Sequence, residues 1–138
     1  MRPTPDEYAA FYQTYMGKVP DGDILETLEA QRRETAVVLA SIGSDKETFR
    51  YAEGKWSVRE AVGHMLDTER VFGYRALHFA RGGEGAIPGM DQDEFARLAP
   101  YADRPLASIA EEFDLLRRSH IAQFATWGDD IMQRSGIA

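Results

Sequence analysis

Apolar side chains recur every three or four positions along most of this chain, a spacing that predicts α-helices. The clearest case is residues 57–81, where two neighbouring apolar stripes share one helix. A helix with two such stripes packs against neighbours on two sides, as in a bundle. The same spacing predicts helices at 24–42 and 105–124 and a shorter one at 5–16. No stretch alternates apolar and polar residues as a strand would, so we expect an all-α protein.

Local signals mark where two of these helices begin. Ser57 and Glu60 stand three positions apart, which is the spacing of a capping box. In that motif the serine hydroxyl accepts the backbone N–H of the glutamate, and the carboxylate reaches back to the serine N–H. Asp21 or Asp23 can cap the helix at 24–42 in a similar way.

The connection between the second and third long helices is unusually long, because about twenty residues separate the glycines after residue 81 from Pro105. Pro105 suits the first turn of a helix, and Asp103 is a nearby cap candidate. A helix of about 25 residues is about 37 Å long, whereas twenty extended residues reach about 66 Å. The connection can therefore run back along the bundle, which predicts that the helices at 57–81 and 105–124 are parallel.

Composition narrows the class of protein. The chain has 138 residues, 43% of them hydrophobic, which suits one globular domain spanning 1–138. Its net charge of −7 and the lack of a basic patch argue against nucleic-acid binding. It has no cysteine, so disulfides, thiolate nucleophiles and zinc–sulfur sites are excluded. Without a signal-like or membrane-spanning run, we expect a cytoplasmic protein that does not enter a membrane.

The three histidines are the first candidates for chemistry. His64 and His78 lie on one predicted helix but about 21 Å apart, too far to share a metal ion. His64 is near the start of its helix and His120 near the end of another, so parallel helices would keep them apart as well. From the residues alone, His64 is either a metal ligand or a packed side chain.

Two carboxylates lie within one helical turn of His64, and they are Glu60 and Asp67. Either could accept an imidazole N–H and orient the ring, as partners of metal-bound histidines do. The alternative, which the sequence favours, is that both belong to an ordinary solvated helix face.

Nearly the whole chain resembles the DinB/YfiT-like family of metal-binding helical bundles, and the resemblance includes residues 20–31, 50–83 and 87–95. The most specific matches are Lys55-Trp56-Ser57, Gly63-His64, Asp67, Glu69 and Tyr74-Arg75. The resemblance implies an up-down-down-up four-helix bundle with a long connection between helices two and three. It also implies a divalent metal, commonly nickel or zinc, held by three histidines. His64 matches the one on helix two, and the other two form a pair one turn apart on helix four.

This sequence departs from the family pattern at its C-terminal end. It has no H-x-x-x-H pair, and Ala138 falls in the connection before the family's fourth helix. We therefore expect a bundle that lacks helix four or is truncated there, with an incomplete ligand set. Either the chain belongs to a longer protein or the site has been lost, since a single imidazole binds metal poorly.

Two functions follow from the resemblance. The first is a metal-dependent enzyme, of the thiol (S-)transferase type, acting on small electrophiles. His64 would then be a metal ligand, and Tyr74 and Arg75 would be pocket residues. The second is a non-catalytic, stress-related helical module for binding or dimerisation, with no intact metal site.

The N-terminal stretch adds an expectation about partners. Its aromatic residues recur at helical spacing on one face, and they are Tyr8, Phe11, Tyr12 and Tyr15. This face is larger than a short helix needs for its own docking, so we expect a homodimer. The alternative is a monomer in which the segment covers its own bundle.

Overall fold

The computed structural model describes residues 2–138, and all of the regular elements among these residues are helical. The three long helices are α2 (Ile24–Ala40), α3 (Val58–Ala80) and α5 (Leu106–Phe124). The short elements are η1 (Ala10–Tyr12), α1 (Gln13–Met16), α4 (Gln92–Leu98), η2 (Pro100–Asp103) and α6 (Asp129–Met132). The expectation of an all-α protein is confirmed.

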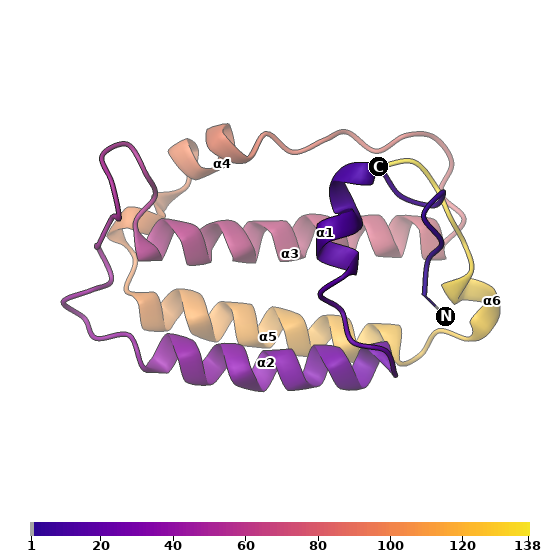
Figure 1. Cartoon of the computed structure of the whole chain (residues 1–138), viewed down its shortest axis with the longest axis horizontal. Coiled ribbons are helices and arrows are strands. Elements are labelled where there is room, and N and C mark those ends of the chain that lie inside the picture. Colours follow the sequence, from indigo (N-terminus) through magenta and orange to yellow (C-terminus); the bar gives the residue numbers. More distant parts are fainter. Residues whose placement is uncertain (1) are drawn as a thin grey trace.

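Helix α5 is the middle helix of the bundle, because it packs along both α2 and α3 while those two hardly touch each other. Figure 1 shows α3 and α5 running in the same direction and α2 running in the opposite one. The connection that carries α4 and η2 returns along α3, on the side of α3 away from α2 (Figure 1). The predicted parallel arrangement of α3 and α5 is therefore confirmed.

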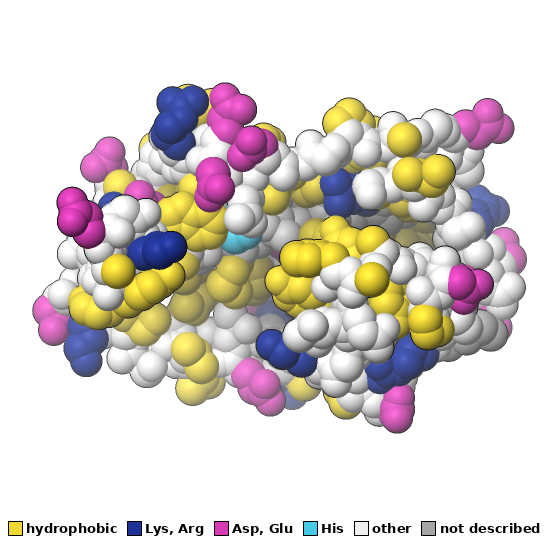
Figure 2. Space-filling view, turned by 45° about the horizontal axis from the view of Figure 1, so that its top comes forward, with side chains coloured by type: hydrophobic (Ala, Val, Ile, Leu, Met, Phe, Trp, Pro, Cys, Tyr) yellow, Lys and Arg dark blue, Asp and Glu magenta, His cyan; other side chains and the backbone are white. Residues whose placement is uncertain are grey.

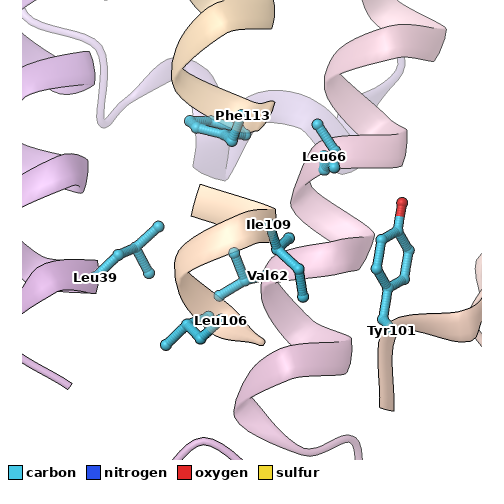
Figure 3. Close-up of a cluster of buried hydrophobic side chains, with 7 residues drawn as sticks. All are labelled: Leu39, Val62, Leu66, Tyr101, Leu106, Ile109 and Phe113. Atoms are coloured by element: carbon cyan, nitrogen blue, oxygen red, sulfur yellow. The ribbon is translucent and has the colours of Figure 1, made fainter. Parts of the chain in front are cut away.

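The core lies where these helices meet (Figure 3), and it consists of Leu39, Val62, Leu66, Tyr101, Leu106, Ile109 and Phe113. Leu66 from α3 and Ile109 from α5 are fully buried. Tyr101 reaches the core from η2 and lies over Gly63, where a Cβ would come within 2.2 Å of the phenol ring. A glycine at this position thus lets the long connection pack directly onto α3.

The ends of α2 and α3 follow the sequence signals. The Ser57–Glu60 capping box is present in both directions, with the Ser57 N–H donating to the Glu60 carboxylate at 2.7 Å. Asp23 caps α2 by accepting the N–H groups of Leu25 and Glu26. Of the two aspartates proposed for that role, Asp23 is the one that caps the helix.

Helix α5 begins differently from the prediction. Pro105 occupies the N-cap position and supplies no side-chain cap, and Asp103 belongs to η2. The Leu106 N–H instead donates to the Glu47 carboxylate at 3.1 Å. The cap comes from a residue far away in sequence, which local spacing does not reveal.

The N-terminal segment, residues 2–21, is less helical than predicted for 5–16, since only 10–16 form helical turns. Thr4 and Glu7 make local hydrogen bonds of 2.7 and 2.9 Å that close a separate turn before it. Side-chain hydrogen bonds of this kind compete with helix formation. Every hydrogen bond found for this segment joins two of its own residues. In Figure 1 it crosses in front of α3 as a separate unit.

Candidate functional site

His64 is half-buried on α3, and its closest polar neighbour is on the same helix. Its Nε2 lies 3.4 Å from the Thr68 hydroxyl, one turn further along. The indole ring of Trp56 lies 4.8 Å from the imidazole, measured between ring centroids. Trp56 directly precedes the capping box, so the start of α3 determines where the indole stands. The first candidate residue is therefore set between an aromatic wall and a hydroxyl.

The two carboxylates predicted to flank His64 are engaged elsewhere. Glu60 accepts from Ser57 and pairs with Arg50 at 2.7 Å. Burial raises the pKa of Glu60, but the hydrogen bonds from Ser57 and Arg50 outweigh it, so the pKa lies below its ordinary value. Glu60 therefore does not orient His64, as the sequence had suggested it could, because its carboxylate binds Ser57 and Arg50 instead.

Asp67 helps to hold the long connection, residues 81–105, against α3. Its Oδ1 accepts the Tyr101 hydroxyl at 2.6 Å. Burial, and then this hydrogen bond, raises the pKa of the Tyr101 phenol well above its ordinary value. Asp67 points to the side of α3 that faces η2, so it does not orient His64 either.

Tyr74 and Arg75 lie more than two turns beyond His64, about 15 Å further along α3. Tyr74 is 58% exposed, and its ring is 6.0 Å from the His78 ring. Arg75 donates to the Pro88 carbonyl at 3.3 Å and lies 5.4 Å from the centre of the Phe72 ring. The structure therefore does not bring these two candidate pocket residues together with His64.

A polar cluster that the sequence reasoning missed joins α3 to α5. The Glu69 carboxylate accepts two hydrogen bonds from Arg117, at 2.7 and 2.8 Å, and lies 3.0 Å from His120 Nδ1. His120 fits over Gly73, where a Cβ would come within 2.1 Å of the imidazole Nε2. Burial raises the pKa of Glu69, but Arg117 and His120 hold it below its ordinary value.

One feature of the sequence could have predicted this polar cluster. Glu69 stands within an otherwise apolar stripe of α3, and a charge in such a place needs a partner on a neighbouring helix. His120 lies beside Gly73, nine residues or about 13 Å beyond His64. The prediction that His64 and His120 do not share a site is confirmed.

Comparison with known proteins places this fold. Residues 27–138 match the sequence profile of the DinB superfamily. The chain belongs to the DinB superfamily. Its structure is similar to that of YfiT from Bacillus subtilis, with a TM-score of 0.66 and 17% sequence identity, covering 86% of this chain and 72% of that one. YfiT is described as a probable metal-dependent hydrolase with an unusual four-helix bundle topology. No protein with a curated description matches the sequence significantly.

The metal that the DinB resemblance implies can be tested against the donors present. Zinc sites use three or four protein ligands, and nickel also needs several converging donors. Within residues 2–138, no three His, Asp or Glu side chains are close enough to hold one ion. His64 alone does not fit nickel or zinc, because the carboxylates nearest in sequence bind other partners.

A hollow lies beside the candidate histidine of this DinB-superfamily chain. We call it the Trp56 hollow; its volume is about 560 Å³, and it is lined by Phe49, Tyr51, Gly54, Lys55, Trp56, Ser57, Val58, Ala61, Gln92 and Asp93. Trp56 contacts both the hollow and His64. Figure 2 shows hydrophobic side chains gathered around a depression on one face, with histidine exposed at its edge. The site thus combines an imidazole with an aromatic recess.

No helix within the described residues has the length and apolar character needed to cross a membrane.

Proposed function

We propose that this chain is the substrate-binding domain of an enzyme that acts on small electrophiles, of the thiol (S-)transferase type. Membership of the DinB superfamily supports an enzyme, as does the fold shared with YfiT, a probable metal-dependent hydrolase. The observation that carries the proposal is the half-buried His64 imidazole, which stands against Trp56 beside the hollow and has no carboxylate partner among residues 2–138.

The residues of this chain can perform the proton transfer that such a reaction needs. The imidazole of His64 accepts the proton of the thiol S–H group, a role that histidine fills more often than any other side chain. The resulting thiolate attacks the electrophilic carbon, forming the S–C bond while the bond to the leaving group breaks. The leaving group departs with the electron pair, and Thr68 steadies the ring through Nε2.

The test is the rate of L-cysteine conjugation to 1-chloro-2,4-dinitrobenzene. We expect the protein to accelerate the reaction over free cysteine and His64→Ala to abolish the acceleration. His78→Ala is the matched control, because His78 is on the same helix but distant from the hollow. Equal rates for His64→Ala and the unchanged protein would contradict the proposal.

Metal dependence is tested separately, by calorimetric titration with zinc or nickel. Because His64 is the single imidazole at the site, we expect weak binding that His64→Ala removes. Tight binding that survives this substitution would show that other residues hold the metal.

A second candidate function, a module that associates with itself, is favoured by the N-terminal aromatic cluster. Phe11, Tyr12 and Tyr15 contact one another, with ring centroids 5.3 to 6.3 Å apart. They remain 71%, 37% and 58% exposed. Burying such side chains against a second copy stabilises a dimer, so we propose that the chain forms homodimers through this cluster.

A further inference from the structure

The Trp56 hollow has aromatic walls that are open to solvent. Phe49 is 62% exposed and Tyr51 is 74% exposed, and Trp56, whose ring lies 4.8 Å from that of His64, lines the same hollow. Exposed apolar surface gathered around a recess is typical of a ligand site. Aromatic rings of a ligand would stack well here, because three side chains of the same kind line one space.

The backbone that carries the aromatic walls of the hollow is held in place by hydrogen bonds. The Phe49 carbonyl accepts the N–H of Val58 at 3.2 Å, which attaches this loop to the first turn of α3. Arg50 donates to the Lys55 carbonyl and pairs with Glu60, so the chain folds back on itself. Gly54, with a φ of +71°, supplies the turn between them. A preformed recess loses little conformational entropy when a ligand enters.

The charges of the hollow come from two different segments. Lys55 precedes α3, whereas Asp93 lies in the first turn of α4. In the described part of the chain neither forms an ion pair, with the other or with any third residue. A ligand that carries one acidic and one basic group would give each of them a partner.

We propose that the Trp56 hollow binds a small aromatic compound that carries both an acidic and a basic group, as a free aromatic amino acid does. The ring lies among Phe49, Tyr51 and Trp56. The acidic group faces the Lys55 ammonium, and the basic group faces the Asp93 carboxylate. The hollow adjoins His64 through Trp56, so binding in the hollow is measured separately from the proton transfer assigned to His64.

Three probes of nearly the same shape separate the contributions of ring and charge. They are L-phenylalanine, 3-phenylpropionate, which lacks the amino group, and 2-phenylethylamine, which lacks the carboxylate. The substitution Trp127→Phe leaves Trp56 as the single tryptophan. The tryptophan fluorescence of this variant therefore reports on the hollow alone. We expect a saturable change with L-phenylalanine, which binds about threefold to fivefold more tightly than either analogue.

Two substitutions, one for each charged residue, test which group of the ligand that residue binds. Lys55→Met should lower the affinity for L-phenylalanine to that for 2-phenylethylamine, and Asp93→Asn should lower it to that for 3-phenylpropionate. The matched controls are Lys46→Met and Glu94→Gln, which remove like charges from outside the hollow. We expect neither control to change the affinity by more than the error of the measurement.

Three results would overturn the proposal. One is that Trp56 emission does not change up to the solubility limit of L-phenylalanine. Another is equal affinity for all three probes. The third is binding that survives Phe49→Ala together with Tyr51→Ala. Each leaves the conjugation assay of His64→Ala unaffected, so failure of this inference is distinguishable from failure of the proposed function.

Discussion

Two regions of this molecule began with the same kind of sequence pattern and ended differently. Along the interface of α3 and α5, the apolar residues Leu66 and Ile109 are fully buried. In the N-terminal segment the aromatic residues contact one another but stay exposed, Phe11 at 71%. The first region is joined across helices by side-chain hydrogen bonds, whereas the segment forms hydrogen bonds only with itself.

The difference shows what apolar spacing can and cannot predict. It identifies side chains whose burial lowers the free energy of the protein. It does not say whether the surface that buries them belongs to the same chain or to a second one. Helices α3 and α5 are long enough to pack over several turns. The helical turns at 10–16 are too short to be stable alone, and we therefore expect the two regions to respond differently to mutation.

The largest effect is expected in the core of the α3–α5 interface. Ile109→Ala removes methylene and methyl groups from a fully buried site and should lower the free energy of unfolding by about 2–5 kcal/mol. Denaturation by urea measures the change. Val37→Ala is the control, because Val37 is 71% exposed, and we expect a change within about 0.5 kcal/mol there. Equal effects of both substitutions would contradict the assigned core.

A smaller effect is expected at the polar cluster of the same interface. Glu69→Gln removes the charge that pairs with Arg117 and His120, and should cost about 2 kcal/mol in the free energy of unfolding. Glu34→Gln, on an exposed part of α2, is the control. A loss no greater than that of the control would show that the cluster contributes nothing.

The same substitution should change the dependence of stability on pH. The pKa of Glu69 is lower in the folded chain than its ordinary value of 4.5, so the unfolded chain binds this proton more tightly. Its contribution is therefore complete above about pH 4.5 and is lost as the pH falls through the lowered pKa. Urea titrations across this range should show a shallower acid loss for Glu69→Gln, and an unchanged slope would refute the assignment.

The smallest effect on stability is expected in the N-terminal segment. Phe11→Asp should change the free energy of unfolding by less than about 0.5 kcal/mol but should convert dimers to monomers in sedimentation experiments. Val37→Asp places the same charge on another exposed apolar position and should leave the mass unchanged. A loss of stability with no change in mass would instead mean that the cluster packs within one chain.

Much of the fold could be predicted because its signals are local. The three long helices lie within two residues of the predicted bounds at each end, and the Ser57 capping box is present. Helix α4 and the 3₁₀ turn η2 were missed because they are too short for apolar spacing to show. The long connection is therefore more structured than its sequence suggests.

The candidate site was harder to predict than the helices. The sequence indicates that His64 and its neighbours are close on one helix, but the partners of Glu60 and Asp67 depend on other segments. Likewise, Glu69 meets His120 only because α3 and α5 pack in one particular register. That register depends on close contacts such as the one at Gly73, where the lack of a side chain leaves room for His120, and such a contact is visible only once both helices are placed.

The parallel course of α3 and α5 has a consequence for the end where both begin. Their aligned peptide dipoles place two partial positive charges side by side, an arrangement that repels itself. Glu60 in the first turn of α3 and Glu47 beside Leu106 supply the compensating negative charges. The Leu106 N–H, and then Arg59, hold the pKa of Glu47 below its ordinary value, so this compensation persists below the pH at which an ordinary glutamate takes up a proton. Mild acid should therefore leave this end of the bundle intact.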